Sequence, residues 1–215
     1  MVGVGENRRP IAARRWRISQ MAADFLVNRK VTPNAISLAG MVAGLLAGAA
    51  LWSTARSPET ATAAWLIASL LIQLRLVANM LDGMVAIGGG TASKLGELYN
   101  DLPDRVSDAA VLIGLGYAAG GEPTLGYLAA LGAIATAYVR AVGQVAGVGA
   151  TFGGPMAKQH RMQVVTLCAL YGAVAGPFVG TELGLPSLAL GIIIAGTFLT
   201  VILRLRRIAQ ALRRR

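Results

Sequence analysis

The chain has 215 residues, of which 55% are hydrophobic and 14% are charged, and its mean hydropathy is +0.59. This composition excludes an ordinary soluble domain and is typical of an integral membrane protein. The formal net charge of +10 would suit nucleic acid, but no nucleic-acid-binding motif accompanies it. We therefore expect the basic residues to set membrane topology and to contact anionic lipids.

Residues 1–31 are predicted to form a cytoplasmic segment that contains an amphipathic helix lying in the membrane interface. Within residues 10–30, Ile18, Met21 and Phe25 recur at helical spacing among arginines. This pattern is typical of a helix that lies flat on the membrane with its apolar side in lipid, so we expect it to precede the first span rather than to cross.

Residues 32–208 are predicted to form six transmembrane helices, which gives an all-α integral membrane fold. The first helix begins at Thr32-Pro33-Asn34, where the threonine can cap the helix and the proline is tolerated in the first turn. The predicted spans cover residues 35–52, 61–86, 95–119, 124–148, 162–179 and 186–203. Residues 209–215 follow as a basic cytoplasmic tail.

The distribution of basic residues predicts the orientation of these spans. Seven basic residues precede the first span and six follow the last, whereas Arg56 is the only one in the loops on the opposite side. The positive-inside rule therefore places both termini, and the loops after the second and fourth spans, in the cytoplasm. We expect a multi-pass protein of the inner (cytoplasmic) membrane.

Polar side chains gather at the cytoplasmic ends of the second and third predicted spans. Asn79 and Asp82 are three residues apart and share one helix face, while Asn100, Asp104 and Asp108 are spaced by fours and share another. The glycine-rich loop at 88–93 brings the two faces together. Oxygen ligands at one depth suit Mg²⁺ or Mn²⁺, which in turn bind phosphate oxygens. Because ionisable residues are costly inside a membrane, we interpret this cluster as a functional site facing the cytoplasm.

Two other interpretations of the cluster stay open. The carboxylates could pair with Arg75, Lys94 and Arg105 only to hold the helices together. They could also form the ion path of a small transporter or channel, but all of them lie near one surface and no matching polar residues occupy the outer halves of the spans. A transporter is therefore the less favoured of the two.

The spacing of these residues resembles the signature of the CDP-alcohol phosphatidyltransferases, D-x-x-D-G-x-x-A-R-x8-G-x-x-x-D-x-x-x-D, across residues 79–104. Matching positions are Asp82, Gly83, Ala86, Gly96 and Asp104. Asparagines stand at the first and third aspartate positions, and Ile87 replaces the arginine. The Thr32-Pro33-Asn34 start and the six spans with an interfacial helix also resemble the family. We interpret the chain as a subtype with Asn79 and Asn100.

The resemblance implies a homodimeric phospholipid synthase that transfers a phosphatidyl group from CDP-diacylglycerol to an alcohol and releases CMP, with Mg²⁺ or Mn²⁺ as cofactor. The implied metal ligands are Asn79, Asp82, Asn100 and Asp104. Asp104 would also be the general base that activates the alcohol. The implied donor-binding residues are Thr32, Pro33, Asn34, Ala35, Gly83, Ser93 and Lys94, with the lysine substituting for the missing arginine.

The two asparagines change the charge that the site offers to metal ions. Four carboxylates offset two divalent ions, whereas the aligned cluster here has a formal charge of about −2, which balances one. An alternative to the enzyme is therefore a non-catalytic membrane protein of the same fold that binds CDP-lipid or serves as a scaffold. The release of CMP by the purified protein would distinguish the two.

Basic residues near the same membrane surface predict how the acceptor alcohol is bound. They are Arg105, Arg140, Lys158 and Arg161. A cationic pocket beside the metal would favour a phosphorylated alcohol, through charge-assisted hydrogen bonds. The alternative is that these residues only obey the positive-inside rule or bind lipid headgroups.

Overall fold

The structure is a computed structural model that describes residues 16–90, 94–149, 153–179 and 183–214, with only the backbone of residues 94–100, 179 and 183. Its long helices are α1 (Arg17–Asn28), α2 (Pro33–Ser53), α3 (Ala61–Gly88), α4 (Lys94–Gly116), α5 (Pro123–Val145), α6 (Lys158–Ala175) and α7 (Leu185–Arg213). A short 3₁₀ helix, η2 (Pro58–Thr60), precedes α3, and the strands β1 (Phe178–Val179) and β2 (Leu183–Gly184) form an antiparallel hairpin.

Four segments in the described part of the chain are long and apolar enough to cross a membrane: Pro33–Ser53, Pro58–Gly88, Pro123–Val145 and Leu185–Arg213. Large apolar side chains on their surfaces are exposed, for example Leu70, Leu131 and Phe198. Exposed apolar surface of this extent is expected where lipid, not water, surrounds the helices. The chain is thus a multi-pass helical membrane protein, while membrane crossing by α4 and α6 remains a prediction.

Local sequence explains where several helices begin. Thr32 caps α2, since its Oγ1 atom accepts a hydrogen bond of 3.3 Å from the backbone nitrogen of Ala35, and Pro33 occupies the first turn. The carboxylate of Glu122 accepts a 2.8 Å hydrogen bond from the backbone nitrogen of Leu125 at the start of α5. This bond stabilises the charged form and lowers the pKa of Glu122.

The observed boundaries differ from the predicted ones near the C-terminal end. The fifth predicted span reached residue 179, but α6 ends at Ala175, because Gly176 takes a φ of +85° and Pro177 follows it. The hairpin after it makes the fold not purely helical. Helix α7 continues beyond residue 203 to Arg213, which makes it about 44 Å long against about 30 Å for the hydrocarbon core.

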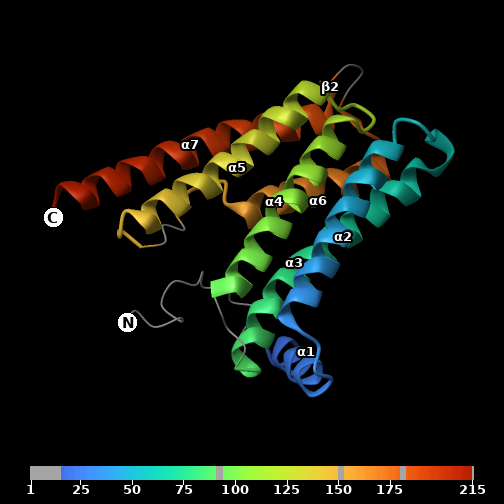
Figure 1. Ribbon diagram of the computed structural model, residues 1–215. Coiled ribbons are helices and arrows are strands. Elements are labelled where there is room, and N and C mark those ends of the chain that lie inside the picture. Colours follow the sequence, from blue (N-terminus) through green and yellow to red (C-terminus); the bar gives the residue numbers. More distant parts are fainter. Residues whose placement is uncertain (1–15, 91–93, 150–152, 180–182, 215) are drawn as a thin grey trace.

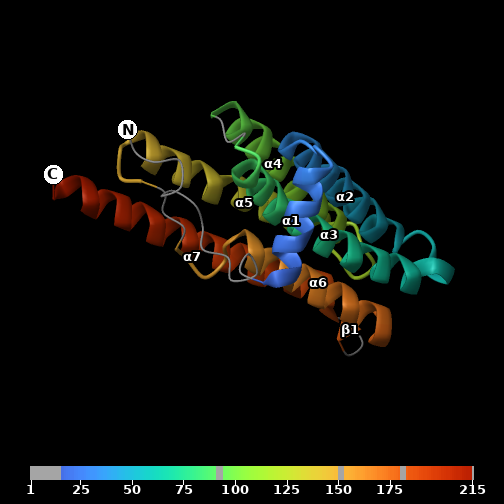
Figure 2. The same ribbon diagram turned by 90° about the horizontal axis from the view of Figure 1, so that it is seen from below.

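The helices form two groups that meet along α4 and α6. Figure 1 shows α2, α3 and α4 side by side on one side of the molecule and α5 running along α7 on the other. Helix α1 lies across the end of α3, as Figure 2 shows from below. Its large apolar side chains Ile18, Met21 and Phe25, and Trp16 just before it, are exposed, which supports the prediction of an interfacial helix.

Close contact between α2 and α4 fixes how α4 faces the site. A Cβ atom on Gly48 would lie 2.4 Å from the backbone oxygen of Ala110, and one on Gly114 would lie 2.3 Å from the oxygen of Gly48. Only glycines allow the two backbones to approach this closely. The buried side chains of Leu51, Trp65 and others fill the space toward the opposite end of the molecule.

Candidate active site

Asp82 lies in the last turns of α3 and is held by α2. It is 2% exposed, and its Oδ2 atom accepts a 2.7 Å hydrogen bond from the hydroxyl of Ser37. Its Oδ1 atom is buried and has no hydrogen bond of acceptable geometry to the described residues. A buried carboxylate oxygen without a donor is costly, so this atom is a candidate ligand for a cation.

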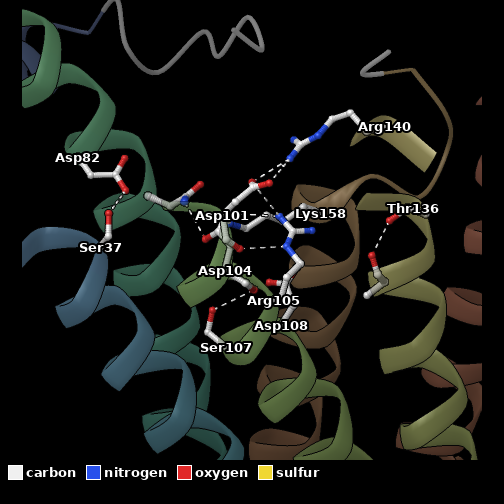
Figure 3. Close-up of polar contacts among 12 residues, drawn as sticks. Ser37, Asp82, Asp101, Asp104, Arg105, Ser107, Asp108, Thr136, Arg140 and Lys158 are labelled. Atoms are coloured by element: carbon white, nitrogen blue, oxygen red, sulfur yellow. Dashed lines mark hydrogen bonds and ion pairs between the residues drawn. The ribbon is translucent and has the colours of Figure 1, made fainter. Parts of the chain in front are cut away.

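Asp104, on α4, lies at the centre of the polar cluster in Figure 3 and is surrounded by donors. Its Oδ1 atom accepts hydrogen bonds from the side-chain nitrogen of Asn79 at 2.8 Å and from the guanidinium of Arg75 at 3.3 Å. Its Oδ2 atom forms an ion pair with the Lys158 ammonium and lies 3.9 Å from the Arg105 guanidinium. Both oxygens of this carboxylate are therefore compensated by protein groups alone.

One turn deeper, a second set of charges forms what we call the floor of the site: Arg75, Asp108 and Arg161. Arg75 and Arg161 approach the two oxygens of Asp108 at 2.6 and 3.4 Å, and the three side chains are 1–2% exposed. Arg161 also donates to the backbone oxygen of Met156 at 2.9 Å and to the hydroxyl of Thr136 at 3.3 Å. The floor thereby ties α3, α4, α5 and α6 together.

On the opposite, exposed side of Asp104 lies what we call the rim: Asp101, Arg105 and Arg140. Arg140 of α5 binds both oxygens of Asp101, at 2.9 and 3.2 Å, as Figure 3 shows. Arg105 approaches one of them at 3.5 Å. The Asp101 side chain is 54% exposed, so the rim lies at the surface of the protein.

The structure brings together some of the predicted site residues and leaves others apart. Asn79, Asp82 and Asp104 lie on facing surfaces of α3 and α4. Three of the predicted basic residues pair with Asp101 or Asp104: Arg105, Arg140 and Lys158. Arg161 instead points into the floor and is 1% exposed, so direct contact with an acceptor is not supported. Ser93 and the side chains of Lys94 and Asn100 lie outside the described residues.

The predicted donor residues Thr32, Pro33, Asn34 and Ala35 form the start of α2, one turn before Ser37, and Gly83 follows Asp82 on α3. Both segments lie at the end of the molecule that also holds α1 (Figure 1). The sequence did not predict the role of Ser37 in holding Asp82. For Arg75 the sequence did offer a signal, because this residue is a charged side chain in the middle of an apolar span.

The described residues fit a metal ion on one side of the site and not on the other. No group of three His, Cys, Asp or Glu side chains close enough to hold a metal occurs among them. Asp82 offers an oxygen without a donor, as hard cations require, whereas both oxygens of Asp104 already face basic groups. The donor set therefore suits a divalent cation at Asp82.

Known enzymes are similar in sequence to this helical membrane protein. No family model matches the sequence. An archaetidylinositol phosphate synthase of Aeropyrum pernix is 33% identical over 203 residues, which cover 92% of this chain and 93% of that protein. A phosphatidylinositol phosphate synthase of Streptomyces avermitilis is 27% identical over 195 residues, or 87% of this chain and 76% of that protein.

Solved structures show the same fold. The phosphatidylinositol phosphate synthase of Mycobacterium tuberculosis with CDP-DAG bound has a TM-score of 0.72 at 20% identity, covering 90% of this chain and 94% of that one. Its complex with manganese and citrate has a TM-score of 0.71 at 19% identity and covers 88% of both chains.

The chain belongs to the CDP-alcohol phosphatidyltransferase family. The family predicted from the signature spacing is thereby confirmed. The subtype defined by Asn79 and Asn100 stays a prediction.

Proposed function

We propose that this chain is a phospholipid synthase that transfers a phosphatidyl group from CDP-diacylglycerol to an alcohol and releases CMP. The observation that carries the proposal is the arrangement of Asp82 and Asp104 on facing helices, with further basic side chains on the exposed side of Asp104. The relatives support it, since two of them are named as synthases of inositol phosphate lipids and a structural neighbour binds CDP-DAG.

The donor would bind where the start of α2 meets the end of α3. Residues Thr32–Ala35 form the N-terminus of α2, where the positive end of the helix dipole favours a phosphate group. Gly83 has no side chain to obstruct the nucleotide, and Ser93 and Lys94 are proposed to complete the contact. Mg²⁺ or Mn²⁺ would be held by Asp82 with Asn79, Asn100 and Asp104 around it. When bound, the ion would neutralise the diphosphate and polarise the phosphorus that is attacked.

A side chain of the protein would then take up the hydroxyl proton of the acceptor. The acceptor oxygen forms a bond to the phosphatidyl phosphorus, the bond from that phosphorus to the bridging oxygen breaks, and CMP leaves with the bridging oxygen. The acceptor's hydroxyl proton passes to Asp104 as general base. Asp104 must first lose one of its donors, and Lys158 is the exchangeable one, because its ammonium, although buried, sits on a flexible stem.

The acceptor is proposed to carry a phosphate. Arg105, Arg140 and Lys158 are the basic side chains on the exposed side of Asp104, where an incoming anion would compete with Asp101 and Asp104 for them. An anionic acceptor would thus draw Lys158 away from the base at the moment that the base is needed. A phosphorylated polyol fits this requirement better than a neutral alcohol.

The direct test is to incubate the purified full-length chain with CDP-diacylglycerol, Mg²⁺ or Mn²⁺ and matched pairs of phosphorylated and free polyols. We expect release of CMP and one new lipid, detected by mass spectrometry, with the phosphorylated member of one pair. The Asp104→Asn variant is the control for contaminating synthases. Binding of CDP-diacylglycerol without CMP release from any alcohol would instead support the second candidate, a non-catalytic CDP-lipid-binding protein, which the full set of donors around Asp104 favours.

We also propose that both termini and the site face the cytoplasm and that two chains form a dimer. A cysteine introduced by Ser57→Cys, in a Cys168→Ala background, should react with a membrane-impermeant thiol reagent added outside intact cells. The connection of α2 to α3 lies at the opposite end of the molecule from the site (Figure 1). Labelling only after the cells are opened would reverse the proposed orientation.

A further inference from the structure

Arg75 is a buried basic residue that the proposed chemistry does not use. It lies on α3, four residues before Asn79 and seven before Asp82, and is 1% exposed. Its Nε atom donates to the hydroxyl of Ser107 at 2.7 Å, and its guanidinium contacts the backbone oxygen and the Oδ1 atom of Asp104 at 3.1 and 3.3 Å. The same guanidinium lies 2.6 Å from an Asp108 oxygen.

The packing around Arg75 leaves the guanidinium little room to move. A Cβ atom on Gly44 of α2 would lie 2.4 Å from the Cβ of Ser107 and 3.5 Å from the Cδ of Arg75. A glycine at this position therefore makes the space through which the arginine reaches α4. Because its stem is enclosed and its head contacts three residues of α4, Arg75 is a fixed charge rather than a mobile one.

Asn79 completes this arrangement. The amide nitrogen of Asn79 donates to the same Asp104 oxygen that Arg75 contacts. An aspartate at position 79 would place a second carboxylate at this distance, and the two like charges would require a cation between them. With asparagine and arginine in place, the protein satisfies Asp104 without any metal.

The charge balance of the described residues agrees with this reasoning. Four carboxylates (Asp82, Asp101, Asp104 and Asp108) are matched by five basic side chains in contact with them or their neighbours: Arg75, Arg105, Arg140, Lys158 and Arg161. The set thus carries a net charge of +1 before any metal binds, so a second divalent ion has no negative charge left to balance. The first can bind at Asp82, because no basic side chain among the described residues forms an ion pair with that carboxylate and its Oδ1 atom lacks a donor.

We infer that Arg75 is a built-in cation that replaces one divalent ion, so that the donor-free protein binds a single metal ion per chain. Arg75 acts as a positioning residue, since it holds Asp104 in place of a metal. The inference rests on the proposed function for its metal, but its test does not require turnover.

The test is a titration of the purified, nucleotide-free protein with Mn²⁺, followed by electron paramagnetic resonance and calorimetry. We expect the unaltered chain to bind one Mn²⁺ and the Arg75→Gln variant to bind two, because Asp104 then needs a new counter-ion. Arg75→Lys keeps the charge and should restore the stoichiometry to one. Two Mn²⁺ on the unaltered chain, or one on a folded Arg75→Gln variant, would overturn the inference.

One further variant separates this role from a general need for positive charge, and a second replaces Arg75→Gln if that variant does not fold. Arg161→Gln removes the other partner of Asp108 and leaves Asp104 untouched, so it should still bind one Mn²⁺. If it binds two, Arg75 has no special part and the inference is wrong. Should Arg75→Gln fail to fold, the double variant Arg75→Gln/Asp108→Asn removes one charge of each sign and is judged by the same stoichiometry.

The outcome is independent of the proposed activity. If the protein binds one Mn²⁺ but releases no CMP, the inference holds and the synthase proposal fails. If it releases CMP while binding two Mn²⁺ without donor, the synthase proposal holds and the role of Arg75 is refuted.

Discussion

The floor and the rim of the site contain the same kinds of ion pair in opposite surroundings. In the floor, Arg75 and Asp108 are 1% and 2% exposed, whereas in the rim Arg140 and Asp101 are 24% and 54% exposed. Water screens the rim pair, so it contributes little to stability and exchanges partners readily. The floor pair is shielded from water, so loss of either partner leaves an uncompensated buried charge. The comparison teaches that the floor supports the helices, whereas the rim pairs can exchange partners, as the proposed acceptor site requires.

The largest expected effect comes from replacing an aspartate by asparagine, once in the floor and once in the rim. Asp108→Asn should lower the free energy of unfolding by about 3–5 kcal/mol, because Arg75 and Arg161 both lose a charged partner. Asp101→Asn, its matched control, should cost at most about 1 kcal/mol. Thermal unfolding in one detergent would measure both variants. Equal destabilisation by the two would remove the distinction between floor and rim.

The second expected effect separates the two carboxylates that lie between floor and rim. Asp104→Asn should lower kcat by roughly 10²–10⁴-fold, the range that general-base catalysis contributes, while CDP-diacylglycerol still binds. Asp82→Asn should instead weaken binding of Mn²⁺ and of the donor, because it removes a charge next to the unsatisfied oxygen. Kinetics and donor binding are measured on both variants. Full activity of Asp104→Asn would identify another base, with Asp101 and Asp108 as the candidates.

Sequence periodicity predicted the members of this site that share a helix. Asn79 and Asp82 share one helix face, and Asp104 and Asp108 share another, because the helical repeat alone determines which residues lie on the same face. The Thr32 cap likewise located the start of α2. These features depend on residues within one turn of each other, so they can be predicted without knowledge of the fold.

The partners of these residues could not be predicted in the same way. Ser37 and Asp82 are 45 positions apart, and Arg75 and Asp104 are 29 apart. Their contacts depend on the relative positions of α2, α3 and α4 along the helix axes. The glycines of α2 determine these positions only once the helices are packed together. Arg161 was predicted to bind the acceptor for its charge and position in the chain, but the angle of α6 turns it into the floor.

The smallest expected effect tests the rim, together with the neighbouring Lys158, as the acceptor site. Arg140→Ala and Lys158→Ala should each raise the apparent KM for a phosphorylated acceptor by at least about 10-fold, since a charge-assisted hydrogen bond contributes about 1.5–3 kcal/mol. Donor affinity should stay unchanged, because the ion pairs of Arg140 and Lys158 are with Asp101 and Asp104 and not with Asp82.

Added salt provides a second measurement of the same pocket. Raising the ionic strength from about 0.01 M to about 0.15 M shortens the screening length from about 30 Å to about 8 Å. The apparent KM of the unaltered enzyme for the acceptor should therefore rise, and it should rise less in Arg140→Ala, which has already lost one of the attracting charges. The free energy of unfolding should change little, since the floor is shielded from the salt. If glycerol and glycerol phosphate were used equally, with no effect of salt or of either variant, the rim would not be an acceptor site and the acceptor would be a neutral alcohol.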